Sequence, residues 1–352
     1  MTLAEHRRAL HQIPETGWDV AKTAGYIKNV LQGFPCEVFS PVEGSVCAFF
    51  DFRRGQTVAF RADMDALPIT EQTGLPFASK HEGKMHACGH DGHMAILLGL
   101  AEYVSRQKEL ERNVLLIFQP AEETTGGAEA LCATGLLKNR QVDSIYGLHL
   151  WPALPKDVVG SREDGLMSRS CEFTVEIRGK TAHIAQWQRG RDALSAAAEL
   201  ISRLYEMAED EPCVLRFGKM ESGTVRNAVS DHTLLEGSLR AFDEELYEEL
   251  KEQIAGISQE VSDETGCQIG LSYSAGYPPI QNDKALLQRA KNRFPMVNVK
   301  PSFTTEDFSC YQRRVPGVFF WLGTGGAPLH SPRFDFDESV LETGLALFQA
   351  LL

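Results

Sequence analysis

Four strand-like runs in this chain each end directly in a cluster of polar, chemically reactive residues. The runs are Thr57–Arg61, Asn113–Phe118, Ser144–Leu150 and Val318–Leu322. Short apolar runs of this kind are typical of strands that are buried on both faces. A helical pattern over Asp91–Arg106 separates the first two runs, and such alternation predicts an α/β fold with a mostly parallel sheet. Because sheets of this type bind ligands beyond the carboxyl ends of their strands, we expect a site where the polar clusters stand.

The pattern changes in the middle of the chain. Between residues 167 and 275 the predicted order is strand, helix, strand, strand, helix, strand, which is the ferredoxin-like arrangement. The α/β pattern returns after Gly276–Pro279. A chain of 352 residues also exceeds what one core usually organises. We therefore predict a larger α/β domain over 1–166 and 276–352 that carries an inserted α+β domain over 167–275.

Composition and charge exclude several classes of protein. A formal net charge of -13 repels phosphate backbones, so we expect no nucleic-acid partner. No apolar run reaches the roughly 18 residues that a membrane span needs, and the N-terminus lacks the apolar centre of a signal peptide. We therefore expect a cytoplasmic protein without a membrane partner. Its eight cysteines are scattered, which favours reduced thiols over a disulfide framework.

The densest polar cluster is the segment His86–His93. It places one thiol, three imidazoles and one carboxylate within eight residues. Thiols and imidazoles are the usual ligands of zinc and its neighbours. Cys88 and His90 stand two residues apart in a glycine-containing turn, so both side chains can reach one ion. His93 could instead face solvent on the first turn of the helix that follows.

Further polar side chains stand at the ends of the strand-like runs. They are Asp63, Asp65, Glu122, Glu123, His149 and His330. Taken singly, each has an ordinary explanation, because aspartates form turns, adjacent glutamates are usually solvated, and a single histidine is usually hydrogen-bonded. Their shared position at strand ends favours one common site. Two divalent ions about 3.5–4 Å apart in such a site would share a water molecule and polarise a carbonyl group.

Four segments closely resemble the aminoacylase-like metallopeptidases. They are Arg61–Pro68, Met85–His93, Phe118–Glu123 and Leu329–Pro332. The nearest branch is the amino-acid-conjugate hydrolases, which include hippurate hydrolases, auxin-conjugate hydrolases and N-acetyldiaminopimelate deacetylases. The resemblance implies a zinc-peptidase-like catalytic domain with an inserted ferredoxin-like lid, and the lid usually forms the homodimer contact. It also implies a metal-dependent amidohydrolase that cleaves the amide bond of an N-acyl amino acid.

The resemblance assigns roles to residues of the larger domain. Five ligands would hold two divalent ions: Cys88, His90, Glu123, His149 and His330. Glu122 would be the general base that takes a proton from the attacking water and passes it to the leaving amine, and burial beside other acids would raise its pKa toward the working pH. Asp63, Asp65 and Asp91 would not bind the ions themselves but would hold the ligand side chains in position. The mixed ligand set is compatible with zinc, manganese, cobalt or nickel.

Three residues of the inserted domain are implied as substrate contacts. His183, in Gly179–His183, would stabilise the oxyanion, often from the partner subunit. Asn227 and Arg240 would hold the substrate carboxylate or carbonyl, and a guanidinium fork suits a carboxylate. His183 could equally be a surface-loop residue, and Arg240 the salt-bridged end of a strand. Relatives usually place a proline after the equivalent of His183, whereas this chain does not.

Two alternatives to an acyl-amino-acid hydrolase stay open. A dipeptidase must recognise a substrate ammonium group, and the sequence shows no dedicated acidic site for one. A non-catalytic metal-binding relative would be expected to lack the base or a ligand, and here none is missing. An assay of N-acetyl amino acids against dipeptides would separate the two enzymatic readings.

Overall fold

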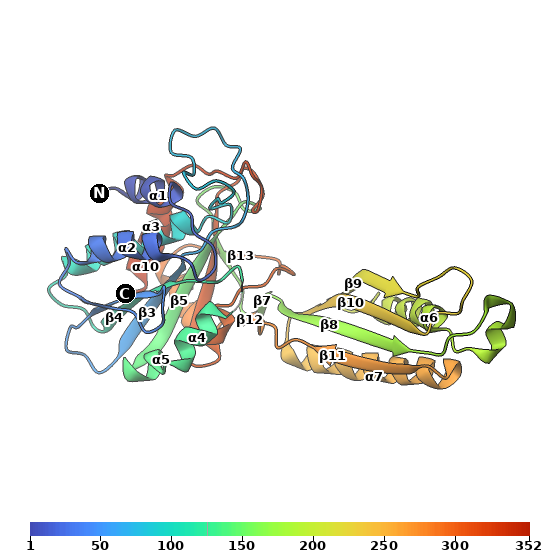
Figure 1. The fold of residues 1–352 in the computed structure, drawn as a ribbon. Coiled ribbons are helices and arrows are strands. Elements are labelled where there is room, and N and C mark those ends of the chain that lie inside the picture. The colour runs from blue at the N-terminus through green and yellow to red at the C-terminus, as the bar shows by residue number, and fades with distance from the viewer. Residues whose placement is uncertain (125) are drawn as a thin grey trace. The chain divides into compact units, whose positions relative to one another are not determined.

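The computed structural model describes residues 1–124 and 126–352, and the chain divides into two compact units (Figure 1). Unit 1 comprises Met1–Asp164, Gln281–Lys300 and Asp307–Leu352, and unit 2 comprises Gly165–Ile280 and Pro301–Glu306. The short segment Pro301–Glu306 therefore belongs to unit 2, whereas the sequence pattern placed it in the larger domain.

Unit 1 is built on an eight-stranded sheet with the order β1-β2-β4-β3-β5-β14-β6-β13. The strands are β1 (Glu37–Phe39), β2 (Val46–Phe50), β3 (Thr57–Asp63), β4 (Asn113–Gln119), β5 (Val142–Trp151), β6 (Val159–Ser161), β13 (Val297–Asn298) and β14 (Gly317–Gly323). The central strands β4, β3, β5 and β14 run parallel, and they correspond to the four runs found in the sequence. Antiparallel pairing occurs on either side of them, between β2 and β4, β1 and β2, and β14 and β6. The predicted α/β fold is confirmed, with a parallel centre in a mixed sheet.

Helices cover both faces of this sheet. They are α1 (Leu3–His11), α2 (Ala21–Leu31), α3 (His90–Ser105), α4 (Gly127–Ala133), α5 (Leu136–Asn139), α8 (Lys284–Arg293), α9 (Ser309–Gln312) and α10 (Val340–Ala350). Alternate residues of a strand point to opposite faces. Phe320 of β14 accordingly stacks on Tyr146 in the core shared with α3 and α10, whereas Phe319 packs against Phe308 beside α9. The polar clusters at the strand ends therefore lie above a fully packed core.

Two glycines bring the start of α3 against the end of β5. Gly89 has φ 84°, a left-handed conformation that glycine adopts readily. A Cβ at Gly92 would lie 2.9 Å from Leu150 Cδ1, closer than real Cβ atoms approach. A larger residue at position 92 would therefore force the Leu150 side chain to shift, and the two glycines let the elements approach so that Cys88 lies beside His149.

Unit 2 contains a four-stranded antiparallel sheet with the order β11-β8-β10-β9. Its elements are β8 (Arg169–Arg178), α6 (Ala193–Met207), β9 (Cys213–Ser222), β10 (His232–Ala241), α7 (Glu244–Thr265) and β11 (Gln268–Tyr273). The order strand, helix, strand, strand, helix, strand agrees with the ferredoxin-like expectation. Apolar residues of both helices pack with alternate residues of the sheet, such as Phe173, Val175 and Ile177 of β8.

Three short elements complete the description. The 3-10 helix η1 (Ile184–Arg189) was not expected from the sequence, and β7 (Gly165–Met167) pairs with β12 (Ile280–Gln281) in a separate two-stranded sheet. Among the described residues, no helix combines the length and the apolar character needed to cross a membrane.

Candidate metal centre

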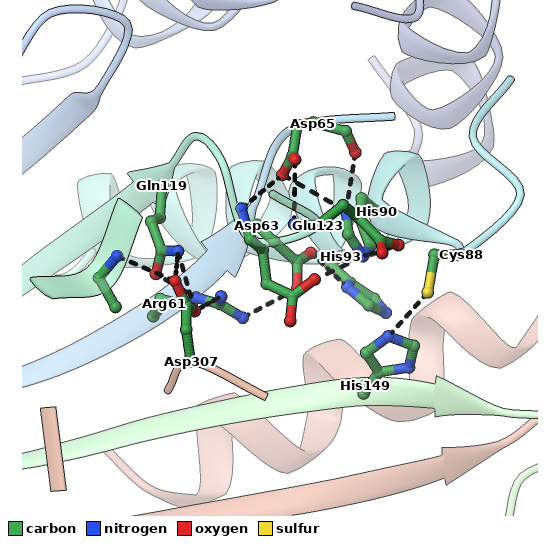
Figure 2. Close-up of polar contacts among 12 residues, drawn as sticks. Arg61, Asp63, Asp65, Cys88, His90, His93, Gln119, Glu123, His149 and Asp307 are labelled. Carbon is green, nitrogen blue, oxygen red and sulfur yellow. Dashed lines mark hydrogen bonds and ion pairs between the residues drawn. The ribbon is translucent and has the colours of Figure 1, made fainter. Parts of the chain in front are cut away.

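The five side chains that the sequence analysis named as metal ligands lie together in unit 1. Potential ligand atoms of Cys88, His90 and His149 all lie within 4.8 Å of one another, and the same is true of Cys88, Glu123 and His330. Cys88 belongs to both groups, so the two groups are adjacent. Figure 2 shows Cys88 facing His149, with His90 and Glu123 beside each other. The arrangement can accommodate two cations that share neighbouring donors.

His149 is oriented by its own strand. Its Nδ1 lies 2.7 Å from the carbonyl oxygen of Leu150, which can only accept, so Nδ1 carries the proton. The Nε2 lone pair then faces the Cys88 Sγ at 3.3 Å. Burial, followed by the nearby His93, lowers the pKa of His149 to about 3. A neutral imidazole with one free lone pair is the form that binds a metal ion.

His90 is oriented in the same way as His149, but by the backbone carbonyl of a residue from another segment. Its Nδ1 donates to the backbone carbonyl of Asp65 at 2.7 Å, and its Nε2 is buried with no hydrogen-bond partner among the described residues. The carboxylate of Asp65 meanwhile accepts the backbone N–H groups of Glu122 and Glu123, at 3.0 and 3.1 Å. Burial raises the pKa of Asp65 to about 8, although these two hydrogen bonds oppose the shift. Asp65 therefore organises one predicted ligand and the paired glutamates.

The paired glutamates follow a strained residue. Ala121 is buried and has φ 57°, a conformation that is uncommon without glycine. A carboxylate oxygen of Glu122 lies within 4.8 Å of the potential ligand atoms of His90 and Glu123. Both glutamates are thus turned toward the same region, and the ordinary explanation of a solvated pair does not describe them.

Glu123 and His330 meet on the more open side of the centre. The Oε1 of Glu123 is buried without a hydrogen-bond partner in the described part of the chain, and it lies 3.4 Å from His330 Nε2. His330 is 54% exposed, has φ 62°, and donates its backbone N–H to the carbonyl of Ala87. The contact with Glu123 raises the pKa of the His330 imidazole. Of the five predicted ligands, His330 is the most accessible to solvent.

The donor set fits divalent cations. Burial raises the pKa of the Cys88 thiol well above its usual range, and the charges of Glu123 and Glu122 raise it further. A thiol in this position stays protonated unless a cation stabilises the thiolate. The His90 Nε2 and Glu123 Oε1 atoms, which are buried and accept no hydrogen bond from the described residues, would also be satisfied by a cation, since such atoms are costly. One thiolate, three imidazoles and one carboxylate are an appropriate set for zinc or a neighbouring metal.

The buried guanidinium group of Arg61 binds several polar side chains next to the candidate ligands. Arg61 donates to Asp63, Asp307 and Gln119, each at 2.8 Å (Figure 2). Gln119 in turn donates to Asp307. Because Arg61 is fully buried with both carboxylates, its charge compensates theirs away from the protein surface.

Asp63 and Asp91 support different parts of the site. Burial alone would raise the pKa of Asp63, but the neighbouring His90, His93 and Arg61 hold it well below its usual range. Asp63 contacts His93 at 2.6 Å, whereas Asp91 accepts from Arg7 and His11.

Asp91 therefore ties the start of α3 to α1, because Arg7 and His11 both belong to that N-terminal helix. It stands next to His90 in the chain, yet its own side chain turns to these two partners, at 3.2 Å from the Arg7 Nε and 2.7 Å from the His11 Nδ1.

The three residues implied for substrate binding lie in unit 2. His183 and Asn227 are exposed on neighbouring loops, where Ile184 N–H donates to the Asn227 carbonyl and His183 pairs with Ala228. Arg240 lies near the end of β10 and donates to the backbone carbonyl of Phe303. From the start of β10 to Arg240 the strand spans about 26 Å. Within a single copy of unit 2, His183 and Asn227 therefore lie near each other, whereas Arg240 lies far from both.

Sequence reasoning missed several residues of the centre. Arg61 and Gln119 could have been found from the sequence, because each is a polar residue inside or at the end of an otherwise apolar strand. Asp307 offers no local signal, since it follows no strand and reaches Arg61 only through the fold. The alternative that His93 faces solvent is wrong, because His93 is buried.

Comparisons with known proteins give the same classification. The model of peptidase family M20/M25/M40 matches residues 59–352. An N-acetyldiaminopimelate deacetylase from Streptococcus uberis is 34% identical, with 98% of this chain and 96% of that protein covered. The corresponding deacetylase from Lactococcus lactis subsp. cremoris is 35% identical, with 97% of this chain and 95% of that protein covered.

A solved structure extends the likeness to the whole fold. The YXEP protein of Bacillus subtilis, described as a dinuclear metal binding peptidase from the M20 family, is 34% identical and has a TM-score of 0.90. The match covers 99% of this chain and 96% of that one. The chain belongs to peptidase family M20/M25/M40.

Proposed function

We propose that this protein removes the acyl group from an N-acyl amino acid, with an acetyl group on a diamino dicarboxylic acid as the first substrate to test. The observation that carries the proposal is the convergence of five predicted ligands, with Glu122 beside them. The two deacetylase relatives act on N-acetyldiaminopimelate by name. Family membership and these relatives make the protein a metal-dependent hydrolase of linear amides.

Cys88, His90, Glu123, His149 and His330 would hold the two divalent cations. When bound, two cations in such a site polarise the amide carbonyl and lower the pKa of water. Asp65 keeps the backbone of Glu122 and Glu123 in place, and Arg61 balances the charge beneath them. The protein thus holds the ligand side chains in fixed positions, as metal coordination requires.

Glu122 would move the proton in this reaction. Its carboxylate takes a proton from water as the water oxygen bonds to the carbonyl carbon, and then gives that proton to the nitrogen as the C–N bond breaks. The products are a carboxylate and a free amino acid. A carboxylate that lies beside the proposed ligands is suited to this exchange, because it can reach both the attacking water and the leaving nitrogen.

His183, Asn227 and Arg240 would contact the substrate from unit 2. His183 would stabilise the oxyanion, and the two others would hold the substrate carboxylate or carbonyl. Because Arg240 lies far from the other two within one unit, a single small substrate would meet them from different subunits. We therefore infer a homodimer through unit 2, and the outer edge of β9, which pairs with no further strand among the described residues, offers a surface for the second copy.

We also infer a cytoplasmic location. The eight cysteines are all free thiols, and thiols persist in reducing compartments. The acidic net charge of -13 again argues against a nucleic-acid partner.

A substrate panel tests the proposal. Protein stripped of metal is assayed with zinc, manganese, cobalt and nickel added back singly, on N-acetyldiaminopimelate, other N-acetyl amino acids and unmodified dipeptides. We expect metal-dependent release of acetate with a preference for the N-acetyl substrates. Faster cleavage of the dipeptides would favour the dipeptidase alternative, and no release of product with any ion would favour a non-catalytic relative.

A further inference from the structure

His93 uses both of its ring nitrogens inside the protein. Its Nε2 lies 2.9 Å from the backbone N of Leu150, and its Nδ1 lies 2.6 Å from Asp63 Oδ1. A backbone amide can only donate, so Nε2 is the acceptor and the proton is on Nδ1, from which it is donated to Asp63. The contacts therefore fix one neutral tautomer of a side chain that is 2% exposed.

This bonding keeps His93 out of metal coordination, although its position would allow it. Potential ligand atoms of Asp63, His90 and His93 lie within 4.8 Å of one another. Coordination through Nε2 would leave the Leu150 amide without an acceptor, and coordination through Nδ1 would remove the proton that Asp63 accepts. The second oxygen of Asp63 is also occupied, since it accepts from Arg61 at 2.8 Å. Asp63 and His93 therefore support the candidate metal centre through hydrogen bonds and do not bind an ion themselves.

The support lies between two proposed ligands. The ring centre of His93 is 5.4 Å from that of His90 and 4.6 Å from that of His149. The residue that it anchors, Leu150, follows His149 directly, and its carbonyl oxygen accepts the His149 Nδ1 proton. On its β3 side β5 is paired only as far as Gly147, so His93 binds the Leu150 amide beyond that ladder, while β14 pairs with the other side of β5 as far as Trp151.

We infer that His93 is a positioning residue that fixes the end of β5, and with it the Nε2 of His149, relative to Cys88 and His90. The anchor is the hydrogen bond from the Leu150 amide to His93 Nε2, and Asp63, held in turn by Arg61, orients the ring. Its effect is to hold the spacing between His149 Nε2 and Cys88 Sγ, which is 3.3 Å. The inference rests on the proposed ligand roles of His90 and His149, and it adds a residue for which no role has been assigned.

Two substitutions separate the two halves of the anchor. In His93→Asn, the amide nitrogen can still donate to Asp63 but does not reach Leu150. In His93→Gln, the amide oxygen reaches the Leu150 amide while the contact with Asp63 is lost. We expect His93→Asn to weaken zinc binding by about 10- to 100-fold, as loss of a ligand's support usually does, and His93→Gln to stay within about threefold of the unsubstituted protein, because the backbone anchor is kept.

Three measurements are made on each full-length variant: zinc affinity by calorimetry, the visible absorption of the cobalt-loaded protein, and the melting temperature without metal. A change in the cobalt spectrum of His93→Asn that His93→Gln reverses would support positioning. Equal losses of affinity and of melting temperature in both variants would overturn it, because a merely structural role predicts that result. Wild-type affinity in His93→Asn would overturn it as well.

His149→Ala distinguishes this inference from the proposed function. If His149→Ala binds zinc as the unsubstituted protein does, the ligand assignment itself fails. If His149→Ala loses one ion while His93→Asn keeps both with normal affinity, only the positioning role fails.

Nitrogen-15 NMR of the unsubstituted protein loaded with cadmium-113 tests the same point without relying on a variant that folds. Cadmium coupling to His90 and His149, with His93 uncoupled and protonated at Nδ1, is expected. Coupling to His93 would overturn the inference.

Discussion

The two groups of predicted functional residues are held in opposite ways. Around the strand ends of unit 1, His90 and His149 are buried and each has one nitrogen fixed by a backbone carbonyl. In unit 2, His183 and Asn227 are exposed on loops. A metal centre needs fixed ligands, whereas a group that contacts a diffusing substrate must be reachable. Substitutions of the proposed ligands and their supports in unit 1 should therefore alter metal binding and stability together, and those in unit 2 should alter turnover alone.

The largest expected effect separates chemistry from metal binding within unit 1. Glu122→Gln keeps the shape of the side chain but removes the proton acceptor, so turnover should fall by about 10²- to 10⁴-fold. Metal content, measured by emission spectrometry, should stay close to that of the unsubstituted protein. Wild-type-like turnover would remove Glu122 as the base, and loss of metal would instead make it a ligand.

The next effect tests the buried charge beneath the centre. Arg61→Met leaves the buried carboxylates of Asp63 and Asp307 without their guanidinium partner, and should lower the free energy of unfolding by about 3–5 kcal/mol. Denaturant unfolding of the metal-loaded protein measures it. The control in unit 2 is Arg178→Met, which removes an exposed guanidinium paired with Glu176. It should change stability little, and equal effects at both positions would break the comparison between the units.

A substitution in unit 2 should show the reverse behaviour. His183→Ala should reduce turnover by about 10²-fold, as expected for loss of one group that stabilises an oxyanion. Because the ring is exposed, the melting temperature and the metal content should not change. A lower metal content would place His183 among the ligands, and unchanged turnover would leave it as an ordinary surface residue.

The smallest effect concerns pH and again belongs to unit 1. Burial lowers the pKa of His11, but Asp91 at 2.7 Å and Glu71 raise it to about 9. Since the pKa is raised above the unfolded value of 6.5, the stabilising contribution is complete below pH 6.5. It is then lost as the pH rises to about 9.

Denaturant unfolding of zinc-saturated protein between these two pH values should therefore show a steeper loss of stability than that of His11→Gln. Parallel curves for the two proteins would contradict the assignment.

The α/β fold and the grouping of polar residues at strand ends could be predicted from the sequence for one physical reason, whereas the five-ligand set was implied by the family resemblance. Strands buried on both faces are continuous apolar runs, and parallel strands present their carboxyl ends together, so Glu123, His149 and His330 could be grouped from the order of residues alone. Asp307 could not be grouped in this way, because its contact with Arg61 depends on how the chain returns to unit 1 after residue 306. The tautomer of His93 likewise follows only from the position of the Leu150 amide.

The role of Asp91 shows the same limit. Its place next to His90 indicated a support for the ligands, yet its partners Arg7 and His11 come from the N-terminal helix. Residues that act through distant charges leave no periodic pattern in a sequence, whereas ligands at strand ends do.

The central claim is that the side chains at the carboxyl edge of the unit 1 sheet surround two cations. Anomalous X-ray diffraction from crystals of the zinc-loaded protein, measured at the zinc edge, tests this most directly. We expect two peaks per chain about 3.5–4 Å apart, contacted by Cys88, His90, Glu123, His149 and His330. Peaks elsewhere, or none within reach of Cys88 and His149, would contradict it.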